Sequence, residues 1–149
     1  MREPMSRRTL VAVAAVACLV SFGARAQDKT VQFHGTLDGA SEVPPNQTQG
    51  TGKVTATLDR KTHTLTYEVT YDGLSGPAAA AHFHGPAAPG KNGGVQVPIQ
   101  PPLASPIHGA AKLSAQQAKE LLDNKWYVNI HTQANKGGEI RGQVLHGGP

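Results

Sequence analysis

The stretch KVTATLDRKTHTLTYEVTY (residues 53–71) alternates apolar and polar side chains on both sides of a polar corner. Val54 and Leu58 occupy apolar positions before the corner, and Leu65 and Val69 occupy apolar positions after it. Side chains two residues apart along a strand point to the same face of a sheet. The stretch therefore predicts a β-hairpin with one apolar face and one polar face.

The same alternation recurs along most of the chain. It predicts further strands over residues 31–37, 79–84, 94–99, 108–113, 126–132 and 139–145. One segment departs from this pattern, because Ser114 and Gln117 have the spacing of a capping box and predict a short helix over residues 115–122. Seven or eight short strands separated by turn residues predict an all-β fold, an antiparallel Greek-key-like β-sandwich with one short helix.

The first 26 residues have the three regions of an export signal. Arg7 and Arg8 precede an uncharged run rich in alanine and valine, and Ala24-Arg25-Ala26 fits a cleavage site. We therefore expect a signal peptide over residues 1–26, with the twin-arginine route as one option, and a single periplasmic or secreted domain over residues 27–149. The apolar run is short for a membrane span, and no later run of about 18 apolar residues follows, so no membrane span is expected.

Composition limits the function of the remaining 123 residues. Their formal net charge is +1, against +4 for the whole chain, so the clustered basic face of a nucleic-acid-binding protein is not expected. The only cysteine, Cys18, lies in the signal, so the exported domain has no disulfide. A chain of this length suits one domain with one hydrophobic core.

The alternation of side chains along each predicted strand, here called strand parity, places several histidines on polar faces. His82 and His84 project together, about 7 Å apart, because they are two residues apart on one strand. Apolar residues mark the core side of the 126–132 strand, so Asn129 and His131 lie on its outer side. The same test places three further side chains on the polar faces of their strands: His34, Glu139 and Arg141.

Three imidazoles from neighbouring strands can bind one ion through nitrogen atoms about 2.1 Å from the metal, which requires ring nitrogens within about 5 Å of one another. Imidazole ligation without thiolate suits copper first and zinc second. The candidate ligands are His82, His84, His131 and His34. Asn129 or Glu139 is expected to accept a hydrogen bond from an imidazole, and Arg141 to guide an anion. Loading should weaken as the pH falls through about 6.5.

Five segments in order resemble the chordin-type (CHRD) domain. They are LDGASEVPP (37–45), AAHFHGPAAPGKNGGV (80–95), KLSAQQAKELL (112–122), WYVNIHT (126–132) and GGEIRGQV (137–144). The resemblance covers nearly all of the expected mature chain and implies a β-sandwich outside the cytoplasm. It does not supply a reaction.

A second likeness is to copper/zinc superoxide dismutase, a Greek-key sandwich that binds copper through a His-x-His strand. It implies copper ligation by His82, His84 and His131, with Arg141 guiding the anion. The chain departs from that family because it has no disulfide cysteines, and the loop over residues 86–94 has no histidine or aspartate to hold zinc.

Three functions are consistent with these patterns. The first is an exported CHRD-domain binding module with a histidine-based transition-metal site on the outer sheet face, whose partner is the metal ion. The second is a metal-free interaction or structural domain, in which the histidines are ordinary polar residues on the wet side of a strand. The third is a copper-dependent enzyme that reacts with superoxide.

Overall fold

The computed structural model describes residues 29–147, so the expected export signal lies outside the described residues. Within this range the chain forms eight strands and one helix. The elements are β1 (Thr30–Asp38), β2 (Thr51–Asp59), β3 (Thr64–Asp72), β4 (Ala80–Gly85), β5 (Gly94–Pro98), β6 (Ile107–Lys112), α1 (Ala115–Leu122), β7 (Trp126–His131) and β8 (Ile140–His146). The expected all-β class with one short helix is confirmed, and the strand ends differ from the expected ones by one or two residues.

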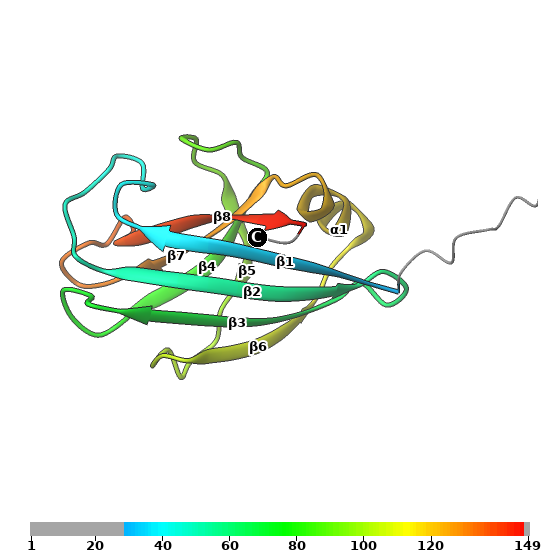
Figure 1. Cartoon of the computed structure of the whole chain (residues 1–149), viewed down its shortest axis with the longest axis horizontal. Coiled ribbons are helices and arrows are strands. Elements are labelled where there is room, and N and C mark those ends of the chain that lie inside the picture. Colours follow the sequence, from blue (N-terminus) through cyan, green and yellow to red (C-terminus); the bar gives the residue numbers. More distant parts are fainter. Residues whose placement is uncertain (1–28, 148–149) are drawn as a thin grey trace, which may run out of the picture.

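All eight strands belong to one antiparallel sheet with the order β5-β4-β7-β8-β1-β2-β3-β6. The sheet folds over at the β1–β8 pair, so that one half faces the other as in a sandwich. Figure 1 shows β1, β2, β3 and β6 as one layer, with β4, β5 and β7 behind it. The hydrophobic core lies between the two halves.

The hairpin predicted over residues 53–71 is formed by β2 and β3. Val54 pairs with Val69, and Leu58 pairs with Leu65. All four side chains are at most 1% exposed. The predicted core side of the other strands is also confirmed, with these residues at most 2% exposed: Phe33, Ala81, Phe83, Val128 and Ile130. Alternation along each strand thus identifies the buried face.

Two glycines allow β1 and β8 to approach closely where the sheet folds over. A Cβ atom on Gly35 would collide with the backbone oxygen of Gln143, and one on Gly142 would collide with that of Thr36. Backbone atoms cannot give way as the end of a flexible side chain can. The fold between the two halves therefore depends on residues that have no side chain at these positions.

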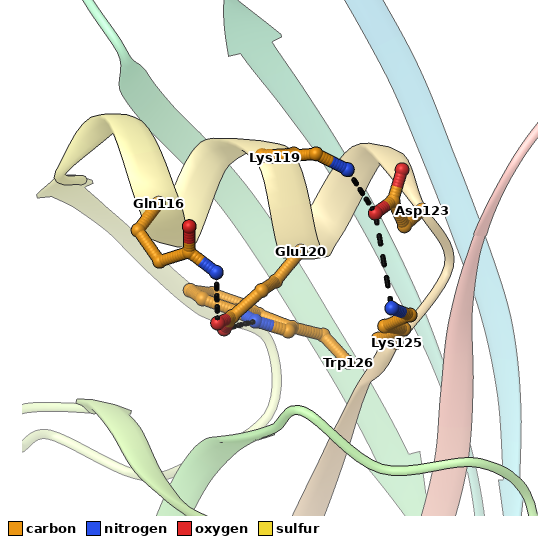
Figure 2. A network of polar contacts seen from close by, with 6 residues as sticks. All are labelled: Gln116, Lys119, Glu120, Asp123, Lys125 and Trp126. Atoms are coloured by element: carbon orange, nitrogen blue, oxygen red, sulfur yellow. Dashed lines mark hydrogen bonds and ion pairs between the residues drawn. The ribbon is translucent and has the colours of Figure 1, made fainter.

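Helix α1 begins with the predicted capping box. Gln117 N donates to Ser114 Oγ, and Ser114 N donates to Gln117 Oε1. Figure 2 shows Glu120 reaching from the helix toward Trp126, whose indole nitrogen donates to it at 3.4 Å. The buried Leu121 joins the helix to the core. Over residues 29–147, the chain forms no helix with the length and apolar character needed to cross a membrane.

Candidate metal centre

Three histidines from β4 and β7 form a cluster on the side of the sheet that faces away from the core. In the pairing of the two strands, His82 lies opposite Asn129, and His131 lies opposite Ala80. One ring nitrogen from each of His82, His84 and His131 lies within 4.8 Å of the other two. His82 Nδ1 and His131 Nε2 are 3.2 Å apart. The rings are therefore close enough to share one ion.

Backbone carbonyl groups fix the tautomers of two of these rings. His131 Nδ1 donates to the carbonyl oxygen of Lys136 at 2.9 Å, and His84 Nδ1 donates to that of Gly93 at 3.0 Å. A carbonyl oxygen can only accept, so each Nδ1 carries the proton and each neutral ring keeps its lone pair on Nε2. Metal-binding histidines in proteins are held in the same way. In His131, Nε2 already lies 3.2 Å from His82 Nδ1 and 3.0 Å from Asn129 Oδ1, whereas His84 Nε2 has no such neighbour.

His84 Nε2 is a buried nitrogen without a hydrogen-bond partner. The His84 side chain is 9% exposed, so water does not readily satisfy this nitrogen. Buried polar atoms normally have a partner, and an orphaned lone pair is costly. A metal ion bound between the three rings would satisfy it, so the donor set fits a transition metal.

Of the other candidate residues, His34 lies away from the three-histidine cluster and Asn129 lies next to it. His34 pairs with Leu145 and Thr55 on the β1 part of the sheet and is not a member of the cluster. Asn129 is 3% exposed, and its Oδ1 lies 3.0 Å from His131 Nε2. Asn129 thus contacts the nitrogen that would bind the metal, rather than the protonated nitrogen on the other side of the ring.

Glu139 is completely buried, and its carboxylate forms its hydrogen bonds with groups other than the imidazoles. Its carboxylate accepts four hydrogen bonds, from Thr48 Oγ1 (2.6 Å), Ser75 N (2.7 Å), Ser75 Oγ (2.5 Å) and Thr132 Oγ1 (2.5 Å). Burial raises the pKa of this carboxyl, but the four hydrogen bonds outweigh it and lower the pKa to about 2. Glu139 is therefore an ionised structural group that joins three loops to the end of the sheet.

Arg141 is also buried, at 1% exposure, although strand parity places it on the outer face. Its guanidinium lies 3.4 Å from the centre of the Tyr127 ring, and the ring of His84 stacks on Tyr127 with a centroid distance of 4.8 Å. Arg141 donates to the Lys91 carbonyl oxygen and to Asn92 Oδ1. It therefore holds the loop over residues 86–93 onto the sheet. A buried guanidinium in this position is not available for the expected role of guiding an anion.

Two loops cover the predicted polar face around Arg141, so this part of the face is buried. Asn92 joins the loops, because its side-chain nitrogen donates to the Val43 carbonyl oxygen at 3.4 Å while its Oδ1 accepts from Arg141. Glu42 lies under the same cover and is 4% exposed. Sequence reasoning missed Glu42 as a buried group, since a glutamate before two prolines has the pattern of an ordinary corner.

Burial raises the pKa of Glu42 to about 7, although the charge of Arg141 and hydrogen bonds from Val43 and Asn129 oppose the shift. The folded protein therefore prefers the neutral acid. The stability that this preference provides is fully present below about pH 4.5 and is lost as the pH rises through about 7.

Replacing Glu42 by Gln should therefore stabilise the protein at pH 8 and have little effect at pH 5. The amide matches the neutral acid in shape and has no charge to desolvate, so we expect a gain of about 2–3 kcal/mol at the higher pH. Urea unfolding of both proteins at the two pH values measures it. An equal effect at both values would contradict a charge-based cause.

A cavity of about 380 Å³ lies beside the histidine cluster. His82, His131, Thr132, Gln133 and Lys136 line it, together with two alanines next to the start of β4. No carboxylate lines this cavity. The cluster is thus open on the side of His82 and His131 and closed on the side of His84.

Comparison with protein families found one match over most of the chain. The model of the CHRD domain matches residues 33–144, a range that contains every residue of the cluster. Searches of curated proteins and of solved structures found no match.

Proposed function

Because the chain belongs to the CHRD-domain family, we propose that it is a binding module that holds one transition-metal ion between His82, His84 and His131. Copper is the preferred ion, and zinc is the second choice. The observation that carries the proposal is the buried, unpartnered Nε2 of His84 within a three-histidine cluster. An exported protein is proposed as well, on the basis of residues 1–26.

The chemistry of the donors supports this choice of metal. Each ring can supply a neutral nitrogen, and copper and zinc accept imidazole more readily than calcium or magnesium do. For a given set of nitrogen donors, divalent copper binds more tightly than the other first-row ions. The superoxide-reacting alternative is based on Arg141 as the guide for the anion, and the 1% exposure of Arg141 does not support it in that role.

Metal analysis of untagged protein, purified without chelator, tests the proposal. Titration with copper and with zinc against a chromophoric chelator should show one tight site per chain and a preference for copper. A chain that binds neither ion more tightly than an unrelated β-sandwich would leave the metal-free interaction domain as the function. Proteins with surface histidines bind copper weakly, so the stoichiometry and the affinity must both be measured.

Export gives a separate expectation for the start of the mature chain. Protein recovered from a periplasmic or culture fraction should begin near Gln27, because the cleavage motif ends at Ala26. N-terminal sequencing or intact mass measures this. An intact Met1 on protein from either fraction would contradict it.

The site should stay loaded with metal at pH values below the pKa of free imidazole. Burial is the main cause that lowers the pKa of both His82 and His84, with further lowering from the neighbouring rings. Both rings therefore stay neutral in the folded protein below about pH 6.5, where an unperturbed histidine takes up a proton. The metal-free fold also loses stability as the pH falls below that value, because unfolding lets the rings protonate.

The measurement is chelator competition at several pH values between about 4.5 and 7.5, a range centred near the free imidazole pKa. The pH of half-loading, corrected for protonation of the chelator, should lie below about 6.5. A value above 6.5 would show that burial does not protect these rings.

A further inference from the structure

We propose that the cavity beside His82 and His131 admits a small anion, which completes the coordination of the bound metal. This inference rests on the proposed function and names the class of ligand that the same site would take. It follows from the number of protein ligands, the position of the cavity and the charges around it.

The cluster supplies too few protein ligands to complete a typical coordination shell. Among the histidine, cysteine and acidic side chains of residues 29–147, only those of His82, His84 and His131 bring three ligand atoms within 4.8 Å of one another. Sites with three protein ligands characteristically leave a position open to water or to an exogenous ligand. The nearby Asn129 Oδ1 is an uncharged oxygen, so it does not compensate the charge of an ion even where it contacts one.

The cluster is reached from the cavity rather than from the side of His84. His82 and His131 line the cavity, whereas His84 is 9% exposed and lies under the Gly93 end of the covering loop. A ligand can therefore reach the cluster from only one of these two sides. The cavity volume of about 380 Å³ is ample for a small anion.

The charges around the cavity favour an anion. Three neutral imidazoles leave the full charge of a divalent ion uncompensated. The two buried acids of residues 29–147 are Glu139, which is bound to three hydroxyl groups and a backbone N–H, and Glu42, which lies under the covering loops beside Arg141. Neither acid lines the cavity.

Lys136 is the one basic side chain among the residues that line the cavity. Its carbonyl oxygen is tied to His131 Nδ1, so the residue is anchored next to the cluster while its side chain remains exposed. Lys136 forms no ion pair with the acids of the described range. A flexible lysine beside an uncompensated metal charge raises the local concentration of anions and stabilises a bound one.

The test uses the copper-loaded full mature chain and azide as the probe anion. Azide that binds to copper produces a charge-transfer absorption band, and copper electron paramagnetic resonance reports the same event independently. The variants are Lys136→Gln, Lys136→Arg and, as a matched control of equal charge change, Lys53→Gln on the exposed side of β2. Each variant is first checked for one copper per chain.

We expect azide to bind the parent protein and to bind Lys136→Gln about threefold to tenfold more weakly at low ionic strength. The difference should shrink at high salt, because exposed charges are screened. Lys136→Arg and Lys53→Gln should behave like the parent. Copper loading without any azide response, or equal azide binding by Lys136→Gln and Lys53→Gln, would overturn this inference alone. Failure of the parent to load copper would overturn the proposed function together with it.

Discussion

The double variant His82→Ala/His84→Ala is expected to bind copper at least about a hundredfold more weakly than the parent protein. Removal of a residue that merely orients a metal ligand costs about tenfold to a hundredfold in affinity, and this variant removes two of three ligands. A single remaining imidazole should bind copper no more tightly than any exposed histidine does. Competition against a chromophoric chelator at pH 7.5 measures the loss.

Two further variants separate loss of ligands from loss of folding. His84 stacks on Tyr127 and is 9% exposed, so its removal also weakens packing. His131→Ala removes a more exposed ligand and should also abolish tight binding, whereas His34→Ala removes a histidine outside the cluster and should not. Circular dichroism establishes that each variant is folded. Copper affinity equal to that of the parent in the folded double variant would show that the pair is merely part of the wet side of a strand.

Replacing Glu139 by Ala should lower the free energy of unfolding at pH 7 by about 2–4 kcal/mol. The change leaves four donors without their acceptor: the buried Thr132 hydroxyl, the half-buried Thr48 hydroxyl, and the backbone N–H and hydroxyl of the exposed Ser75, which water can partly satisfy. Each buried donor left unpaired costs about 1–3 kcal/mol, although relaxation of the hydroxyl groups recovers part of the sum. Urea unfolding followed by tryptophan fluorescence suits this measurement, because Trp126 is completely buried.

Glu68→Ala is the matched control, since Glu68 is an exposed acid whose one ion pair within the described part of the chain is with the exposed His108. We expect that control to stay within about 0.5 kcal/mol of the parent. The pKa of Glu139 is depressed to about 2, so its contribution is present above about pH 4.5 and is lost as the pH falls toward 2. The difference between parent and Glu139→Ala should therefore narrow in acid. A loss of less than about 1 kcal/mol at pH 7 would contradict the structural role.

The features that sequence predicted correctly are those with a local cause. Alternation over a few residues identifies the buried faces of β2, β3, β4 and β7, and the spacing of Ser114 and Gln117 identifies the helix start. Parity also predicts that His82 and His84 project together. That His131 joins them required β4 and β7 to be neighbours, and the structure shows that pairing.

The features that sequence did not predict depend on contacts between distant segments. Parity tells which way Arg141 points from its strand, but not that the loop over residues 86–93 folds down onto it. Likewise, the pattern around Glu42 does not show that Asn92 ties its loop to the other one. These loops determine which side chains on the outer face are buried. The periodicity of the sequence identifies only the face that packs against the core.

The place of β1 in the sheet has a consequence for the order in which the molecule assembles. β1 pairs with β2, its neighbour in sequence, and also with β8, the last strand within residues 29–147. One half of the sheet, β1-β2-β3-β6, can therefore form early, but it cannot join the other half until β8 has been synthesised. Because this closing pair has nearly the largest sequence separation that the chain allows, its formation carries a large loop-closure entropy. Folding of the sheet is thus expected to finish only once β8 is available to pair, on the milliseconds-to-seconds timescale of all-β domains.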